Sequence, residues 1–242
     1  MLVNLIGYGN VPIGYGIDYY YLVLILPALA LSLFAQFKVK STFAHYSQVA
    51  SRSGLSGEMA ARQILDRNGL FAVRIEKTPG QLTDHFDPRT NVLRLSDSTF
   101  ASRSIAAIGV AAHESGHAIQ HDEGYLPNKL RSALVPLANI GSTAGPYIAL
   151  FGIILSMQFL MNIGIVLFAF AVLFYIITLP VEFNASRRAI QVLEEQGMLM
   201  EDEIRGAKKV LSAAALTYIA SALMAFASMM RLILLSRNRN RR

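Results

Sequence analysis

The longest uncharged stretch of the chain does most to limit its possible folds. From Ser132 to Val181, fifty consecutive residues include no Asp, Glu, Lys, Arg or His. A single helix of that length would be about 75 Å long at ~1.5 Å per residue, whereas the hydrocarbon core of a bilayer is ~30 Å thick. We therefore expect this stretch to cross a membrane twice as a helical hairpin. Its turn is expected near Gln158 to Asn162, and Gly145 and Pro146 mark a kink or the entry to the first helix.

Two further stretches have the composition of membrane-spanning helices. Residues 19–37 include no charged side chain or histidine, and Lys38 and Lys40 follow at once. Because the positively charged segment that begins a cleaved signal peptide is missing, this stretch is interpreted as an uncleaved membrane anchor. The uncharged run 210–230 is rich in alanine, which suits close packing of helices in lipid, although a buried helix of a soluble protein could look the same.

The composition of the whole chain agrees with a membrane protein. Hydrophobic residues make up 53% and charged residues 16% of the sequence, whereas roughly 25% of residues are charged in soluble domains. The chain has no cysteine, which excludes disulfides, thiol nucleophiles and thiolate metal sites. We expect an integral membrane protein with about four transmembrane helices.

The segment 41–131, between the anchor and the hairpin, is polar and has mixed α and β patterns. A helical pattern at 54–70 stops at an Asn-Gly pair, and a longer one at 102–121 follows good cap residues. Between them lie three short runs with strand character, the last two separated by the turn-forming sequence DPRT: 72–78, 81–86 and 91–96. The expected fold class is therefore α+β, within a mainly helical membrane protein.

The longer helical pattern carries HESGH, in which His113, Glu114 and His117 match the motif H-E-x-x-H. Residues i and i+4 lie on one face of a helix, so two imidazoles can reach one Zn²⁺ at about 2.0–2.1 Å each. Glu114 projects beside them, where it can take a proton from a water on the metal. The competing interpretation is a polar helix face whose histidines satisfy hydrogen bonds. Gly116, inside the motif, indicates close approach by a ligand or by another backbone.

Two histidines leave a catalytic zinc one protein ligand short. Glu182 is favoured as the third ligand, because a membrane hairpin returns the chain to the side that it left and so brings this carboxylate to the face of His113 and His117. The alternative for Glu182 is a carboxylate that the helix dipole favours at a helix start. His121 is two helical turns from His113 and drifts from the pair. The other candidates are His85, Asp122 and Glu123.

Three strings of the sequence together resemble one family. LTDHFDPRTNVLRLS, AAHESGHAIQH and LPVEFNASRRA look like the YugP-like zinc-dependent membrane metallopeptidases of bacteria, the neutral zinc metallopeptidase family. More remotely, HESGH followed by a hairpin and EFNAS is similar to the HtpX and prenyl-protein endopeptidase clan, in which E-x-x-A-D supplies the third ligand. By that likeness Glu182 is the ligand and Ala185 the small residue. Ser186 stands where the clan has aspartate.

The resemblance implies a small gluzincin-like zinc peptidase domain at the membrane surface, with one Zn²⁺ per chain held by His113, His117 and Glu182. It implies an endopeptidase in which Glu114 accepts a proton from the attacking water and returns it to the leaving amine. The expected partners are a peptide or membrane-protein substrate and the lipid bilayer, with no nucleic acid, and the oligomeric state stays open. The rival interpretation is a non-enzymatic membrane protein with a structural or transport-related His/Glu metal site.

Four further polar residues have two interpretations each. Asp84 and His85 could lie near the site or could shape the turn that follows them. Arg187 and Arg188 could stabilise an oxyanion or bind a substrate carboxylate, or they could reach toward lipid headgroups.

The distribution of basic residues favours one orientation in a plasma membrane. Under the four-span model, Lys and Arg number seventeen on the side of residues 38–133 and 181–209 and five on the other side, so the site is expected to face the cytoplasm. The expected organisation is an N-terminal segment (1–18), a transmembrane anchor (19–37), a peptidase region with the H-E-x-x-H helix (38–131), the hairpin (132–181), a helix that supplies the third ligand (182–209), a fourth membrane helix (210–235) and a basic tail (236–242).

Overall fold

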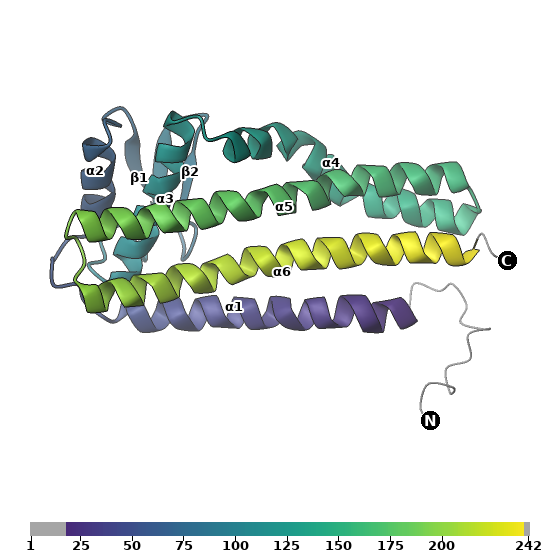
Figure 1. Ribbon diagram of the computed structural model, residues 1–242, viewed down its shortest axis with the longest axis horizontal. Helices are drawn as coiled ribbons and strands as arrows, with labels where there is room; N and C mark the ends of the chain where they lie inside the picture. Colours follow the sequence, from purple (N-terminus) through teal and green to yellow (C-terminus); the bar gives the residue numbers. More distant parts are fainter. Residues whose placement is uncertain (1–17, 240–242) are drawn as a thin grey trace, which may run out of the picture.

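The computed structural model of the chain describes residues 18–239, so residues 1–17 of the expected N-terminal segment and 240–242 of the basic tail lie outside the described residues. Most of the chain is helical, with one small sheet (Figure 1). The elements in chain order are a π-helical turn η1 (Tyr21–Ile25), α1 (Leu26–Ser47), α2 (Gly57–Arg67), β1 (Arg74–Thr78), β2 (His85–Asp87), β3 (Val92–Ser96), α3 (Ile105–Asp122), α4 (Leu126–Leu155), α5 (Gln158–Glu195) and α6 (Glu201–Arg239).

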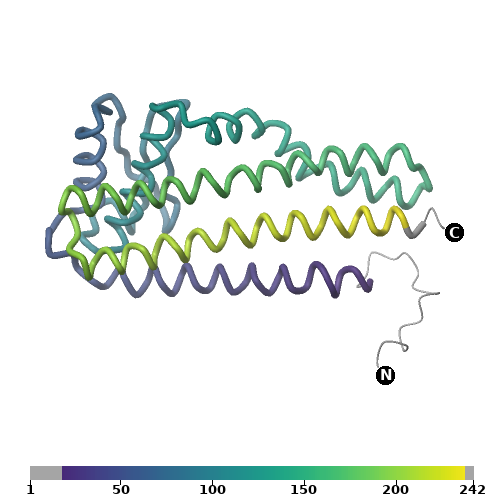
Figure 2. The backbone as a smooth tube through the Cα atoms, viewed as in Figure 1, coloured from purple at the N-terminus to yellow at the C-terminus, as the bar shows by residue number. Residues whose placement is uncertain are grey.

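Four long helices lie side by side, and the polar elements gather at one end of them (Figure 2). At that end α1 and α5 finish and α6 begins, whereas the α4–α5 turn lies at the opposite end. Four helical segments are long and apolar enough to cross a membrane: Tyr21–Ser47, Leu126–Leu155, Gln158–Glu195 and Glu201–Arg237. The predicted α+β membrane protein with four transmembrane helices is confirmed.

The hairpin turns slightly earlier in the chain than the sequence predicted. Helix α4 ends at Leu155, Ser156 takes a left-handed conformation with φ of 61°, and α5 begins at Gln158. The polar residues that suggested the turn lie inside the first turn of α5, where Gln158 Nε2 donates to Asn162 Oδ1 at 2.9 Å. Helix α4 contains two prolines, Pro136 and Pro146, and bends along its length (Figure 1). Gly145 and Pro146 lie inside α4, which begins at Leu126, so they do not mark the entry to the first helix of the hairpin.

Helices α4 and α5 approach each other most closely at glycine residues. A Cβ on Gly145 would lie 2.8 Å from the backbone nitrogen of Phe168 and 3.0 Å from the carbonyl oxygen of Gly164. A Cβ on Gly164 would in turn lie 2.6 Å from the Cα of Ala149. Small residues let helix backbones approach closely in lipid, where burial of apolar surface gives no drive for association. The glycines therefore allow the two helices of the hairpin to lie in close contact.

The polar elements α2, α3 and the small sheet lie at one end of the long helices, and α2 and α3 pack against α5 and α6 there. The sheet has the order β1-β3-β2, with β1 parallel and β2 antiparallel to the buried central strand β3. Strand β2 is shorter than predicted, and Asp87 belongs to it rather than to the turn. Side chains of α2 and α3 share one core with those of α5 and α6: Ile64, Ile108, Leu193, Ile204 and Leu211. The membrane helices therefore supply part of the core of the peptidase region, and a second cluster is formed by α2, α3 and the sheet alone.

Candidate metal centre

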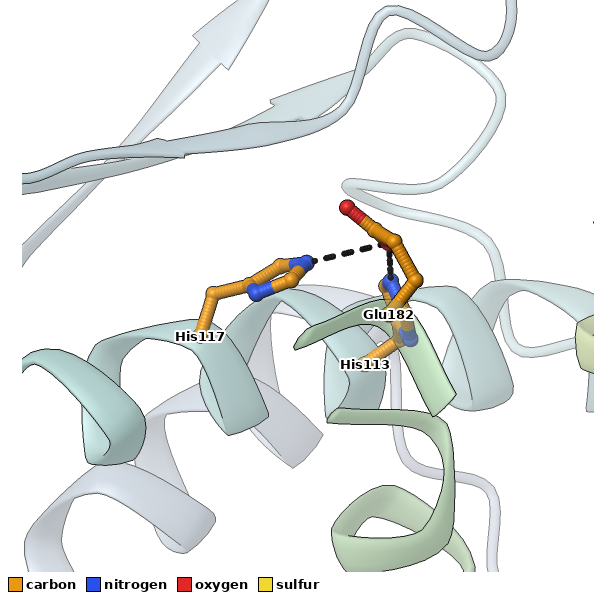
Figure 3. A group of neighbouring side chains, drawn as sticks. All are labelled: His113, His117 and Glu182. Atoms are coloured by element: carbon orange, nitrogen blue, oxygen red, sulfur yellow. Dashed lines mark ion pairs between the residues drawn. The ribbon is translucent and has the colours of Figure 1, made fainter. Parts of the chain in front are cut away.

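Helix α3 presents the two motif histidines to α5. The hydroxyl of Ser104 accepts from the backbone N–H of Ala107 and so caps α3, which places His113 and His117 one turn apart on a single face. Their rings are 4.8 Å apart, edge to face. Both point toward the carboxylate of Glu182, which α5 contributes (Figure 3). The hairpin brings the three side chains together as the sequence predicted.

The geometry of these three residues fits a metal ion. Oε2 of Glu182 lies 3.3 Å from Nε2 of His113 and 3.5 Å from Nε2 of His117, and the ligand atoms of all three residues lie within 4.8 Å of one another. Ligands at about 2.1 Å from a tetrahedral ion are about 3.4 Å apart. Glu182 is only 2% exposed, and its Oε2 atom has no hydrogen-bond partner among residues 18–239. A buried carboxylate oxygen rarely stays unpaired, and two imidazoles with one carboxylate are a donor set that suits zinc.

The Nε2 atom of each histidine faces Glu182, and a neutral polar side chain contacts the Nδ1 atom of each ring and so orients it. Nδ1 of His113 lies 3.1 Å from Oγ of Ser186, and Nδ1 of His117 lies 3.0 Å from Oε1 of Gln120. An amide oxygen accepts but cannot donate, so His117 carries its proton on Nδ1 and leaves Nε2 free to bind a metal. Ser186, which stands where the wider clan has aspartate, contacts a motif histidine directly.

Gln120 also joins α3 to the part of α5 that holds Glu182. Its fully buried amide donates to the backbone carbonyl of Val181 and to Oδ1 of Asn184, each at 2.9 Å. The same Asn184 oxygen accepts from Nε of Arg188 at 2.8 Å. One side chain thus fixes the ring of a histidine and the backbone next to the carboxylate.

Arg188 has a role that neither sequence interpretation anticipated. Its guanidinium binds both carboxylate oxygens of Glu123, at 2.9 and 2.6 Å, and so ties α5 to the end of α3. Hydrogen bonds from Arg188 hold the pKa of Glu123 below its ordinary value. These contacts engage three of the five N–H donors of Arg188 within the protein, and the two interpretations of Arg188 stay predictions.

Arg131 is a neighbour of the site that the sequence reasoning missed. Its Nη1 donates to Oε1 of Glu182 at 3.3 Å, on the carboxylate oxygen that faces away from the histidines. Arg131 is the last charged residue before the fifty-residue uncharged run. Because the hairpin returns the chain to the side that it left, the two residues that flank the uncharged run, Arg131 and Glu182, come close together. Their contact could therefore have been predicted from the sequence.

Glu114 is buried in α3, beside His113 in sequence and outside the group of possible ligands. Burial lowers the pKa of His117, but the negative charges of Glu182 and Glu114 outweigh it, so the pKa is raised above its ordinary value. Glu114 therefore lies close enough to the pair to interact with it electrostatically.

Gly116 allows α3 and α5 to meet. A Cβ at this position would lie 3.0 Å from the carbonyl oxygen of Ala185 and 3.4 Å from its Cα. The close approach that the glycine indicated is therefore an approach of backbone to backbone. It sets the distance between the two helices that carry the histidines and the carboxylate.

The other candidate ligands lie away from this group. His121 is exposed, with its ring 5.9 Å from that of Phe86 on β2, and His85 places Nδ1 2.9 Å from the carbonyl oxygen of Thr83. Glu123 is taken by Arg188, and Asp122 is exposed. Asp84 accepts from the backbone N–H and the hydroxyl of Ser96 at the end of β3, whereas the side chain that bonds within the turn itself is Asp87, which accepts from the backbone N–H of Arg89.

Comparisons with known proteins place the chain in a family. A family model described as "Putative neutral zinc metallopeptidase" matches residues 21–237, from the first membrane helix to the last. The "Putative membrane protease YugP" of Bacillus subtilis (strain 168) is 48% identical over 218 residues, which cover 90% of this chain and 97% of the relative. No solved structure matches the chain. Because both matches extend over almost the whole sequence, the chain belongs to the neutral zinc metallopeptidase family.

Proposed function

We propose that the chain is a membrane-embedded zinc-dependent endopeptidase. In this proposal His113, His117 and Glu182 hold one zinc ion per chain, and Glu114 is the general base. The observation that carries the proposal is the buried Oε2 atom of Glu182, which faces two imidazole nitrogens at 3.3 and 3.5 Å. Within the part of the chain that the structure describes, this atom has no hydrogen-bond partner. Three protein ligands leave one position of a catalytic zinc open for water.

The protein's own groups divide the chemistry between them. Zinc, when bound, lowers the pKa of a water toward ~7 and polarises the scissile carbonyl. The carboxylate of Glu114 takes the proton of the attacking water and returns it to the leaving amine. Ser186 and Gln120 keep both imidazoles oriented toward Glu182 throughout.

An extended peptide fits this site better than a folded one. The order β1-β3-β2 makes β2 an edge strand, and its Phe86 contacts the ring of His121 on the helix that carries the motif. A peptide that pairs with the free edge of β2 would run past the histidines, with backbone hydrogen bonds supplying affinity. A loop or end of a membrane protein at the cytoplasmic surface is the substrate class that this position favours.

Replacement of Glu114 by Gln tests the enzymatic role. The amide keeps the size of the side chain but cannot accept the proton, so hydrolysis of an unfolded test protein such as casein is expected to fall at least 100-fold. Zinc content is expected to stay near that of the unchanged protein, because Glu114 is no ligand in the proposal. Glu195→Gln, an exposed change on α5, is the matched control.

If the metal site is structural or transport-related and has no catalytic role, the opposite result is expected for Glu114→Gln. A structural or transport site has no need of a base beside its ligands, so Glu114→Gln would leave every measured property unchanged. Loss of zinc in this variant would show instead that Glu114 is a ligand.

A further inference from the structure

A groove lies between α5 and α6, on a different face of α5 from Glu182. Its volume is about 540 Å³, within the range of sites for small molecules and lipids. One stripe of side chains on each helix, at i, i+3, i+4, i+7 and further positions, forms its walls. The stripes are Phe183, Ser186, Arg187, Ile190, Gln191 and Glu194 on α5 and Lys208, Leu211, Ser212, Ala215, Leu216 and Ile219 on α6. We call this feature the α5–α6 groove.

The α5–α6 groove changes from charged to apolar along its length. Lys208 and Glu194 pair at 3.0 Å at the end near the α5–α6 connection. Arg187 lies further along and is exposed, and among residues 18–239 no acidic side chain forms an ion pair with it. Beyond Arg187 the walls are apolar, with Phe183 45% and Ile219 39% exposed. The groove thus offers one unneutralised cation beside an open apolar channel.

This polarity matches the expected depth of the groove in a bilayer. The uncharged run ends at Val181, and Arg187 follows six residues later, about 9 Å further along the helix at ~1.5 Å per residue. The polar headgroup layer on each side of the ~30 Å hydrocarbon core is roughly 5–8 Å thick. On α5 the backbone of Arg187 is therefore at the outer edge of the headgroup layer, and its long side chain can reach back to the headgroups. On α6, Ile219 lies nine residues inside the uncharged run that begins at Val210, so it faces the acyl chains.

From these features we propose that the α5–α6 groove binds one phospholipid with an anionic headgroup. Arg187 pairs with the headgroup, and one acyl chain lies against Phe183, Leu216 and Ile219. A soluble anion would gain nothing from the apolar half of the groove, and a neutral lipid would leave the charge of Arg187 uncompensated. Ser186 borders the groove and contacts Nδ1 of His113, so the bound lipid lies directly behind the candidate metal centre.

Lipid retention by the full chain tests the proposal without any assay of hydrolysis. Protein purified in a neutral detergent is titrated with phosphatidylglycerol or phosphatidylcholine, and bound lipid is counted by native mass spectrometry. The unchanged protein is expected to retain one phosphatidylglycerol in preference to phosphatidylcholine. Arg187→Gln is expected to weaken that binding about fivefold, the effect of one basic residue at an anionic surface.

Two further variants separate a specific site from general attraction. Lys209→Gln removes a cation next to the groove that does not line it, and is expected to leave phosphatidylglycerol binding unchanged. Ala215→Phe fills the groove without a change of charge and is expected to lower binding. Equal losses in the Arg187 and Lys209 variants, or full binding in Ala215→Phe, would overturn the proposal. So would unchanged lipid binding in Arg187→Gln together with a raised KM for peptide, which would assign the groove to substrate.

Discussion

Both candidate histidine ligands are held by neutral partners, and this affects how tightly they would bind zinc. Hydrogen bonds to the second ring nitrogen of a metal-binding histidine fix its tautomer and its orientation. His113 has a hydroxyl partner and His117 an amide partner. The amide of Gln120 also holds the carbonyl of Val181, next to Glu182, so this residue orients groups on both helices.

Gln120→Leu is therefore expected to weaken zinc binding by about 10- to 100-fold, the usual effect of removing such a partner. The measurement is a zinc titration of metal-free protein with a competing chelator. Gln120→Glu still accepts from His117 but cannot donate to Val181 or Asn184, and is expected to recover part of the affinity.

Glu123→Gln is the control for this prediction. It weakens the outer contact between Arg188 and α3 and leaves Gln120 unchanged. Because exposed ion pairs contribute little, its zinc affinity is expected to match that of the unchanged protein. Equal affinity in the Gln120→Leu protein would show that the network does not position the site.

Helical spacing and the hairpin were enough to predict the four proposed site residues, His113, Glu114, His117 and Glu182. The hydrogen-bond partners of the two histidines could not be predicted in the same way. Which side chain of α5 meets His113 depends on the rotation of α5 about its axis, and the glycine contacts that set this rotation are visible in the sequence only as small residues.

At the scale of elements, the glycine contact between α4 and α5 controls how the hairpin is built. Gly164→Ala places a Cβ against the backbone of Ala149, so one helix must move. Overpacking of this kind is expected to cost about 1–3 kcal/mol in the free energy of unfolding. Unfolding by sodium dodecyl sulfate in mixed micelles measures this change.

The matched control is Val166→Leu, two residues away on the exposed face of α5. It enlarges a side chain that meets lipid, and its free energy of unfolding is expected to stay within about 0.5 kcal/mol of the unchanged protein. If Val166→Leu is the more damaging change, the α4–α5 contact is wrong.

The elements show which boundaries a sequence determines well. Charge-free runs predicted the four spans, because only helices of sufficient length satisfy their backbones in lipid. The turn at Ser156 was missed because Gln158 and Asn162, which look like turn residues, bond each other within a helix. Strand β2 was overestimated, since residues 81–84 have strand-like composition but Leu82 has a positive φ of 56°.

At the scale of the whole molecule, the peptidase region and the membrane helices share a core, and large apolar side chains remain exposed along all four long helices. Examples are Phe34, Phe151, Phe159 and Phe226. Exposed apolar surface of this extent indicates contact with lipid. The candidate metal centre lies at the end of the long helices where the polar elements gather (Figure 1), which a bilayer around the helices would bring to the level of its headgroups.

Cysteine labelling tests the proposed cytoplasmic orientation, and the cysteine-free chain needs no background substitutions. Gln81→Cys lies in an exposed loop of the peptidase region, and Met157→Cys lies at the exposed hairpin turn. An impermeant maleimide is expected to label Met157→Cys in intact cells and to label Gln81→Cys only after permeabilisation. The reverse pattern would place the site outside.

The central claim is that two distant parts of the chain, α3 and the end of the hairpin, build one zinc site. Zinc per chain, measured on purified protein by inductively coupled plasma mass spectrometry, tests it most directly. The unchanged protein and His121→Ala are expected to hold one zinc ion, whereas Glu182→Ala is expected to hold far less. Full zinc in Glu182→Ala together with loss in His121→Ala would contradict the claim, because the site would then be built from α3 alone.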